Sequence, residues 1–574
     1  MRFIVGFGSV SVVFSGASIP AQAQTSVPPG VDLPPTTPST IERTLPTPSE
    51  TAPRSIPNLE APPDSNLKVP DLLNPPEPGN LPEQRFPVRQ IEVLGNTVLQ
   101  YEITQLVTPF ENRDVTFNEL IGLRSAITQL YIDNGYITSG AFLPNNQDLS
   151  DGVVQIQVVE GEIERIEIRG LKRLRESYVR DRINLGTDPP LNQQRLEREL
   201  QLLQLDPLIE KIETELTAGS TPGQNILLVD IDQAPGFQTN LAFDNYRAPS
   251  VGTLQGTVDI AHNNVLGFGD RIFGTYSLSD GLNTFDLGYN VPINARNGSV
   301  GVQFSNSDSE IVEAAFRDLG IKSDSQTLSF NLRQPIIRNP EQELALGLGF
   351  DLRRSQTFLL DNIPFSFSPG PREGESKVRV LRFTQDWIDR KAQRILAARS
   401  QFSWGLNIFD ATVNDTGPSA EFFSWLGQFQ WVQQLSARHL MVTQVRAQLT
   451  PDSLLPLEKF SMGGIDTVRG YAQNQLLADN GVLASVELRI PLLSDVDRLQ
   501  LTPFVEMGQV WNNSGLDLEQ STLASIGLGA RWNIYKGLRA RVDFGIPLIN
   551  TSDRGNSLQE AGFYFSLQYT PPGF

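Results

Sequence analysis

From about residue 236 to its end, the chain alternates apolar and polar residues with a period of two. Successive side chains of a β-strand point to opposite faces, so this pattern predicts strands. It continues over about 340 residues with turn residues between the runs, which is typical of a membrane β-barrel. At about 21 residues per strand and loop, roughly sixteen antiparallel strands fit, enough for an aqueous channel. Clear runs are Leu254–Ile260, Phe285–Val291, Val486–Ile490, Leu538–Ile546 and Phe563–Tyr569.

A soluble β-sandwich is the alternative interpretation of the same period. Charged residues share the polar face of several runs, opposite aromatic and aliphatic residues; they include Arg489, Arg539, Arg541 and Asp543. In a sandwich this face would meet bulk water. In a barrel it lines a wet lumen while the apolar face meets lipid. We therefore expect a transmembrane barrel over residues 236–574.

Residues 86–235 mix helical spacing with short strand-like runs. Residues 90–94 alternate as a strand, apolar residues recur at helical spacing from Phe117 to Tyr131, and Asn134-Gly135 ends that helix. Two further runs complete a β-α-α-β-β unit at residues 86–160. The pattern repeats at residues 161–235, where Leu196, Leu200 and Leu203 mark a helix. We therefore predict two small α/β domains in tandem.

Small sheets of this kind have exposed edges. An unpaired edge strand can accept an extended peptide as an additional strand. The two units are therefore candidates for binding unfolded polypeptide. The alternative is that they only act as spacers.

The N-terminus has the features of an export signal. A short positive start at Arg2 precedes an apolar stretch from Phe3 to Phe14, and Ala21-Gln22-Ala23 forms a small-residue cleavage site. We expect residues 1–23 to be a signal peptide. Residues 24–85 contain sixteen of the 40 prolines, which predicts an extended, disordered linker. A spacer or a tether to peptidoglycan is the alternative for that linker.

Composition excludes several kinds of chemistry. The net charge of −19 argues against a nucleic-acid partner, because phosphate binding needs a basic surface. The chain has no cysteine, which rules out disulfides, thiolate zinc sites and a cysteine nucleophile. Its two histidines, His262 and His439, lie far apart. We expect no metal, no cofactor, no catalytic residues and no enzymatic activity.

One segment interrupts the barrel pattern, at residues 459–471. It places an arginine and a tyrosine among three glycines, between two strand-like runs. Glycines permit tight turns, and an arginine there can reach a carboxylate with its planar fork. The segment is therefore a candidate for a loop that folds back into the barrel. An ordinary hairpin loop with a solvated arginine is the alternative.

Several of these residues carry a resemblance to a known family. The strand of the first unit, Asp133-Asn-Gly-Tyr136 and Val158–Ile166 resemble polypeptide-transport-associated (POTRA) domains of TpsB two-partner secretion transporters. Val468-Arg469-Gly470-Tyr471 resembles the loop-tip motif of the BamA/TpsB superfamily. That motif pairs with an F-x-D-x-G strand motif, which here is Phe504-x-Glu506-x-Gly508 with glutamate for aspartate. The resemblance implies a loop locked inside the lumen by an Arg469–Glu506 pair.

The resemblance also implies a function. The family's transporters sit in the outer membrane of diderm bacteria with POTRA domains in the periplasm, and they secrete, and in some cases activate, an unfolded TpsA exoprotein. Lipid and the barrel assembly machinery are further implied partners, the latter reading C-terminal aromatics such as Tyr569 or Phe574. Many relatives carry an N-terminal helix that plugs the barrel, and the proline-rich tract shows no such helix.

Two other functions share parts of this pattern. A BamA-type insertase, which assembles barrels in the membrane, has the same loop motif and usually more POTRA domains. A passive porin would be a barrel without a protein cargo and would not need the α/β units. Two units favour the secretion transporter.

Overall fold

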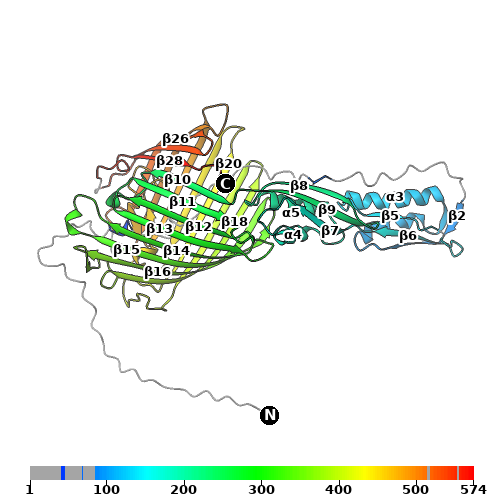
Figure 1. Cartoon of the computed structure of the whole chain (residues 1–574), viewed down its shortest axis with the longest axis horizontal. Coiled ribbons are helices and arrows are strands. Elements are labelled where there is room, and N and C mark those ends of the chain that lie inside the picture. The colour runs from blue at the N-terminus through cyan, green and yellow to red at the C-terminus, as the bar shows by residue number, and fades with distance from the viewer. Residues whose placement is uncertain are drawn as a thin grey trace, which may run out of the picture.

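The structure is a computed structural model that describes residues 41–44, 67–68, 85–145, 147–513, 518–551 and 555–573. Figure 1 shows a barrel of long strands and two α/β units that follow one another away from one of its ends. We call the barrel end beside the second unit the proximal end, and the opposite end the distal end. The predicted signal peptide, residues 1–23, lies outside the described residues.

The barrel consists of sixteen long antiparallel strands, as the alternating pattern predicts. It closes where the first strand pairs with the last, Leu241 opposite Tyr569. A two-residue strand, β17 (Ile363–Pro364), also pairs with β16. The sixteen strands are β10 (Phe237–Asp244), β11 (Gln255–Asn263), β12 (Arg271–Ser279), β13 (Leu282–Pro292), β14 (Ser299–Glu310), β15 (Lys322–Arg338), β16 (Gln342–Leu359), β18 (Glu375–Lys391), β19 (Arg394–Gly405), β20 (Phe423–Gln434), β21 (Leu440–Leu449), β24 (Asn480–Pro491), β25 (Leu499–Trp511), β26 (Thr522–Tyr535), β27 (Leu538–Pro547) and β28 (Phe563–Tyr569).

The barrel strands turn their apolar side chains outward. Val258, Ile260, Phe285 and Leu287 are all exposed, as expected for a surface that meets lipid. The alternate residues of each strand face the lumen, and one of them, Asp543, is fully buried. An inside-out distribution of this kind would be unstable in a water-soluble sandwich, because it leaves an apolar band around the whole molecule.

The first α/β unit contains a three-stranded sheet in the order β3-β6-β5. The helix α3 begins at a capping box: the Thr116 side chain accepts from the Glu119 backbone, and the Glu119 side chain accepts from the Thr116 backbone. It ends at Asn134, as predicted. The elements are β2 (Arg85–Val88), β3 (Gln90–Leu94), α2 (Gln100–Val107), η1 (Thr108–Phe110), β4 (Arg113–Thr116), α3 (Phe117–Asp133), β5 (Gly140–Phe142) and β6 (Val153–Val159).

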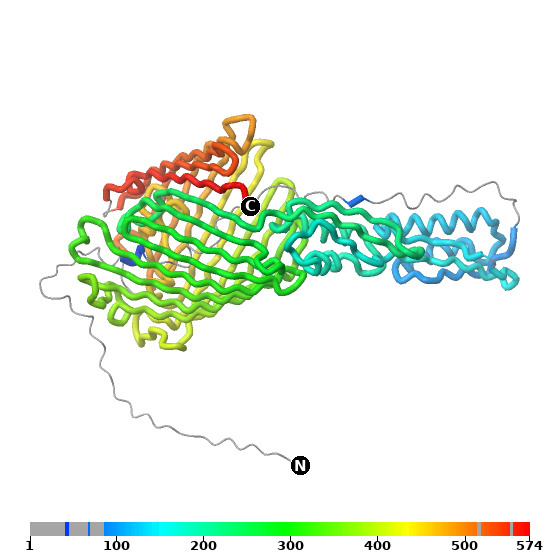
Figure 2. The backbone as a smooth tube through the Cα atoms, viewed as in Figure 1, coloured from blue at the N-terminus to red at the C-terminus, as the bar shows by residue number. Residues whose placement is uncertain are grey.

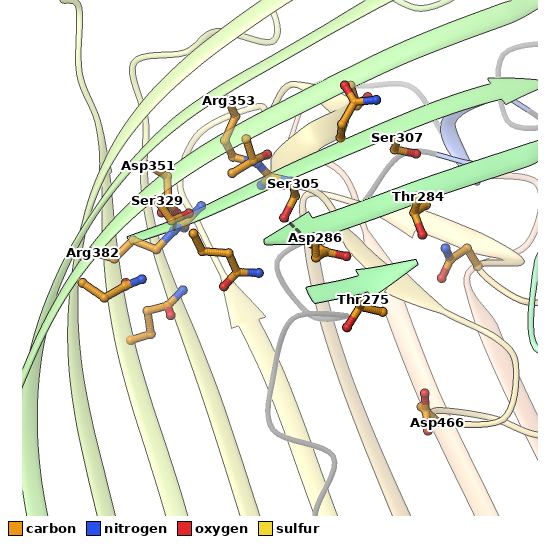
Figure 3. Close-up of a pocket in the computed structure, with 18 of the residues that line it drawn as sticks. Thr275, Thr284, Asp286, Ser305, Ser307, Ser329, Asp351, Arg353, Arg382 and Asp466 are labelled. Carbon is orange, nitrogen blue, oxygen red and sulfur yellow. Dashed lines mark hydrogen bonds and ion pairs between the residues drawn. The ribbon is translucent and has the colours of Figure 1, made fainter. Parts of the chain in front are cut away.

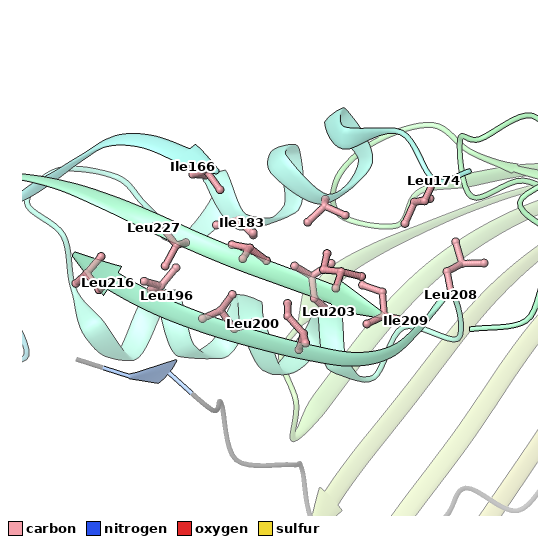
Figure 4. Packing of buried hydrophobic residues seen from close by; sticks show 14 of the residues in the cluster. Ile166, Leu174, Ile183, Leu196, Leu200, Leu203, Leu208, Ile209, Leu216 and Leu227 are labelled. Atoms are coloured by element: carbon pink, nitrogen blue, oxygen red, sulfur yellow. The ribbon is translucent and has the colours of Figure 1, made fainter. Parts of the chain in front are cut away.

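The second unit has the same plan and an apolar core of its own (Figure 4). The predicted helical residues Leu196, Leu200 and Leu203 are buried and pack against the sheet. The sheet order is β1-β8-β9-β7. The elements are β7 (Glu162–Arg169), α4 (Glu176–Ile183), η2 (Asn184–Gly186), α5 (Gln193–Gln204), β8 (Ile209–Ala218) and β9 (Gln224–Gln233), with β1 (Leu67–Lys68) added at the edge.

Two stretches of the predicted disordered linker correct that prediction. Leu67 and Lys68 pair in parallel with Thr214 and Glu215 of β8, and Leu67 packs against the core of the second unit. Residues 41–44 form a helical turn inside the distal part of the barrel. These contacts join residues far apart in sequence, so the local composition of the tract does not indicate them.

The second unit contacts the proximal turns of the barrel directly. The Arg175 backbone N–H donates to the Gly267 carbonyl (2.9 Å), and the Arg175 guanidinium lies 3.6 Å from the centre of the Phe268 ring. The Arg182 side chain donates to Asn297 Oδ1 (2.6 and 3.1 Å). These contacts fix the orientation of the second unit relative to the barrel (Figure 2). None of the helices among the described residues is both long enough and apolar enough to cross a membrane.

Candidate functional site

The segment between β21 and β24 folds into the lumen rather than away from the distal end. It contains η5 (Pro456–Glu458) and a small hairpin of β22 (Phe460–Met462) and β23 (Leu476–Ala478). Nearly every residue from 454 to 481 is buried. An apolar cluster of loop and wall residues explains why: Phe460, Met462, Val468, Tyr471, Ala478, Leu483, Val510 and Leu523. We call residues 450–479 the lumen loop.

Arg469 lies at the tip of the lumen loop in a socket of three carboxylates. Its Nε donates to Glu506 Oε1 (2.8 Å), and its Nη2 donates to the same oxygen. Its Nη1 donates to Asp543 Oδ1 (2.6 Å) and to Glu487 Oε2 (3.0 Å). The Phe504 ring centre lies 3.4 Å from the guanidinium carbon. Each planar N–H edge of the arginine is therefore matched by an acceptor, and its face by an aromatic ring.

The strand register creates this socket. Glu487, Glu506 and Asp543 stand at lumen-facing positions of β24, β25 and β27. Phe504 precedes Glu506 by two positions and thus shares its face. A Cβ on Gly527 would lie 2.2 Å from Phe504, so a glycine on β26 makes room for that ring.

The glutamate at position 506 also binds the loop backbone. Its Oε2 accepts from the Arg469 backbone N–H (2.6 Å), while Oε1 accepts from the guanidinium. One carboxylate thus fixes both the main chain and the side chain of the same residue. All the charges involved are nearly buried, and removing one partner of such a pair typically costs about 3–5 kcal/mol.

The rest of the motif fixes the backbone of the tip. Gly470 has φ of +97°, a conformation that favours glycine, and its N–H donates to the Tyr564 hydroxyl (2.9 Å). The Tyr564 hydroxyl in turn donates to the Tyr471 carbonyl. The Tyr471 hydroxyl lies 2.8 and 2.9 Å from the carbonyl oxygens of Ala524 and Ile549. A Cβ on Gly545 would lie 2.6 Å from the Gly470 nitrogen, so the tip rests directly on β27.

The structure brings all seven sequence-predicted residues together. Val468 is fully buried in the apolar cluster, and Gly508 lies beneath Met462, where a Cβ would be 2.3 Å from the sulfur. Sequence reasoning missed Tyr564 altogether and gave Glu487 only as a polar position of its strand. It placed Asp543 on the lumen face but did not connect it with Arg469. The parity of the strands is the signal that could have found the two additional carboxylates.

A wider charge network surrounds the socket. Glu487 Oε1 also accepts from Arg531 Nη2 (3.1 Å) and Arg489 Nε (3.4 Å), and Asp543 Oδ2 accepts from Arg541 Nε (2.6 Å). Glu506, by contrast, is bound by no other cation among these arginines. Arg469 is therefore its neutralising partner. Of the described residues, no group of His, Asp and Glu is placed to hold a metal ion.

Two family models match the sequence. The family described as haemolysin secretion/activation protein ShlB/FhaC/HecB matches residues 223–532, more than half of the chain. The chain belongs to this family. The ShlB-type POTRA domain matches residues 86–161. We therefore call the two α/β units POTRA 1 and POTRA 2. Membership of the ShlB/FhaC/HecB family places the chain among TpsB-type outer-membrane transporters, a class of proteins that are not enzymes.

Individual relatives agree with the family model. The outer membrane transporter CdiB of Escherichia coli is 27% identical over 429 residues, which are 71% of this chain and 70% of CdiB. The heme/hemopexin transporter protein HuxB of Haemophilus influenzae is 22% identical over 512 residues, 84% of this chain and 87% of HuxB. The solved structure of CdiB from Escherichia coli has a TM-score of 0.65 at 24% identity, covering 87% of this chain and 93% of that one. It has the same fold.

The lumen loop of this ShlB/FhaC/HecB protein lines two cavities inside the barrel. One cavity of about 720 Å³ has polar walls that include Thr275, Asp286 and Ser305, with Arg43 of the helical turn at its edge (Figure 3). A second cavity of about 500 Å³ is lined by the Arg469 socket. Asp466 of the loop borders both. The two cavities also share the wall residues Arg333, Asp386 and Arg399, so they adjoin beside the loop.

The helical turn at residues 41–44 is bound to the loop. Lys459 Nζ donates to Glu42 (3.0 Å), Arg43 donates to the Gln475 carbonyl (2.9 Å), and Asn474 donates to the Arg43 carbonyl (3.1 Å). Ile41 packs into the distal apolar cluster. The proline-rich tract, in which the sequence shows no plug helix, thus contributes a helical turn at these residues to the lumen.

Proposed function

We propose that this chain is the outer-membrane transporter of a two-partner secretion system, which exports, and in some systems activates, a TpsA exoprotein. The main observation behind this proposal is the lumen loop. A passive porin keeps its lumen open, whereas here a buried arginine fixes a loop inside the lumen. The two POTRA domains add a place to receive a polypeptide. In this proposal they lie in the periplasm.

In the proposed mechanism, POTRA 1 receives the unfolded cargo by strand addition. Its sheet has the order β3-β6-β5, so β5 is an edge strand among the described residues, although the Ala141 N–H donates to the Thr128 hydroxyl (3.0 Å). Phe142, on this strand, and Leu94, on the opposite edge strand, are exposed apolar residues. Backbone hydrogen bonds to β5 would supply affinity, and Phe142 would select an apolar residue of the cargo.

The Arg469 socket is the proposed gate of the conduit. With the tip seated, the loop and residues 41–44 would narrow the lumen too much for a polypeptide to pass. Cargo would compete for the lumen once the tip is released. Val468, Arg469, Gly470 and Tyr471, with Phe504, Glu506 and Gly508, would then set the balance between the resting and secreting states.

The experiment is co-expression in a diderm host with a TpsA protein encoded by the same genome. Intact protein, Arg469→Ala and an empty vector are compared for cargo in the medium. Release that needs the intact protein supports the proposal. Failure of release, together with loss of outer-membrane barrel proteins on depletion, would instead support a BamA-type insertase. A BamA-type role is the second candidate because that superfamily shares the loop-tip motif.

A further inference from the structure

The stem of the lumen loop carries a second buried charge, Glu458, at the end of η5. Its side chain is 1% exposed. Arg382 Nη2 donates to both of its carboxylate oxygens (2.9 and 3.1 Å). Arg353 Nη1 donates to Oε1 (2.8 Å) and to the neighbouring Leu457 carbonyl (2.6 Å). Nothing in the loop-tip motif points to this residue.

The two arginines belong to the barrel wall. Arg353 lies on β16 and Arg382 on β18, and these strands are paired. Arg382 is held in place by Asp351 (Nε to Oδ2, 2.6 Å) and by the Ser403 hydroxyl (2.9 Å). Figure 3 shows Asp351, Arg353 and Arg382 on the wall of the larger cavity. Arg382 is thus fixed by the wall itself, and together with Arg353 it forms a basic socket for a carboxylate.

The two sockets have opposite charges and lie on different parts of the wall. At the tip, a loop arginine enters an acidic socket on β24, β25 and β27. At the stem, a loop glutamate enters a basic socket on β16 and β18. The strands β19, β20 and β21 separate the two sockets in the closed order of the barrel. The loop therefore spans the lumen between two fixed points.

We infer that Glu458 is a second anchor of the lumen loop, a positioning residue that acts independently of the Arg469 socket. When the tip is released, the stem stays bound to β16 and β18. The tip then swings while the stem acts as its pivot. Full withdrawal of the loop requires both sockets to be vacated. Release of the tip alone therefore opens the conduit only in part.

An apolar contact supports the stem as a pivot. Leu454, Leu455 and Leu457 pack against Val378 and Val380 of β18. In addition, the Gln448 amide donates to the carbonyls of Glu458 and Asp479 (both 3.0 Å), so it connects the stem to the last residue of the loop. The inference concerns the resting position of the loop, so it does not depend on the identity of the cargo.

The test uses the absence of cysteine from the chain. Single cysteines are introduced in otherwise full-length protein in lipid nanodiscs, and a small methanethiosulfonate reagent measures how often each becomes accessible. Leu457→Cys reports on the stem, Val468→Cys on the tip, and Ile395→Cys on the barrel wall away from the loop. All three side chains are nearly inaccessible in the resting state, at 1%, 0% and 2% exposed.

We expect Glu458→Gln to raise the labelling rate of Leu457→Cys by about tenfold or more, since the neutral amide loses the charge-assisted hydrogen bonds from Arg353 and Arg382. The rate at Ile395→Cys should not change. Arg469→Ala should act on Val468→Cys and leave Leu457→Cys within about threefold. The double variant should raise both rates. Glu343→Gln is the matched control, because it removes a carboxylate from β16 that pairs with Arg333 and does not touch the loop.

Two results would overturn the inference. One is an unchanged rate at Leu457→Cys in Glu458→Gln. The other is an equal rise at Ile395→Cys, because Glu458 would then stabilise the barrel as a whole rather than position the loop. If Glu458→Gln does not assemble, Arg382→Gln tests the same anchor from the wall, with the same three reporters and the same criteria.

Discussion

The most informative perturbation of the loop tip is Arg469→Ala. It removes the guanidinium from three carboxylates at once, but these carboxylates are not equally affected. Glu487 keeps Arg489 and Arg531, and Asp543 keeps Arg541. Glu506 loses its cation and is left buried at 4% side-chain exposure. The consequence of the substitution is therefore concentrated on Glu506.

The expected magnitude follows from that one uncompensated charge. Breaking a buried ion pair by removing one partner costs about 3–5 kcal/mol. The cavity of about 500 Å³ that is lined by Glu506 admits water, which places the cost near the lower value, about 3 kcal/mol. About 1.4 kcal/mol corresponds to a factor of ten. The equilibrium constant for seating the tip should therefore fall roughly a hundredfold.

Thiol accessibility at Val468→Cys measures this equilibrium directly. The labelling rate of the Arg469→Ala protein should exceed that of the protein with Arg469 by about 100-fold. Arg438→Ala is the matched control, because Arg438 lies in an exposed proximal turn and bonds to the Leu493 carbonyl, far from the loop. A difference of less than about threefold between Arg469→Ala and the control would refute the claim that the socket holds the tip.

Further predictions concern the socket wall and POTRA 1. Glu506→Gln keeps the shape of the side chain and removes its charge, so labelling at Val468→Cys should rise by about tenfold; no rise would show that Glu506 is not the principal partner. Gly545→Val places a Cβ 2.6 Å from the Gly470 nitrogen and should unseat the tip. Gly256→Val should not, because no heavy atom outside the adjoining residues lies within 4 Å of the Cβ that it adds. Equal labelling of Val468→Cys in the two variants would contradict the close approach of the tip to β27. In POTRA 1, burial raises the pKa of Glu160, but hydrogen bonds from Thr97, Tyr131 and Val98 outweigh it and leave the pKa lowered. Its contribution to stability is therefore present above about pH 4.3 and lost as the pH falls through the lower folded value. Urea unfolding of the POTRA domains in the full-length chain should show a shallower loss of stability between pH 6 and pH 3 for Glu160→Gln, and identical pH dependences would contradict this prediction.

The barrel could be predicted because a transmembrane wall imposes a strict rule on every strand. A shift of one residue would turn Val542 and Phe544 into the lumen and Asp543 into lipid, so the period of two has to persist. The helix α3 could also be predicted, because its apolar residues recur at helical spacing from Phe117 to Tyr131 and Asn134-Gly135 ends it. The Arg469–Glu506 contact was predicted from a resemblance between motifs rather than from the pattern itself.

The parts that could not be predicted depend on contacts between distant residues. Glu487 and Asp543 meet Arg469 only because β24, β25, β26 and β27 adopt a particular register. Glu458 looks like any polar loop residue until β16 and β18 place two arginines beside it. Residues 41–44 contact the loop across more than 400 positions of sequence, and four residues carry no periodic signal.

The central claim is that this chain alone conducts an unfolded exoprotein across a membrane. Purified full-length protein is reconstituted into liposomes, a urea-denatured TpsA protein from the same genome is added to the POTRA side, and the cargo protected from added protease is measured. We expect protected cargo only in liposomes that contain the transporter, and less of it when excess unlabelled TpsA is added. Absence of protected cargo, with an added unfolded barrel protein instead becoming inserted in the liposome membrane, would contradict it.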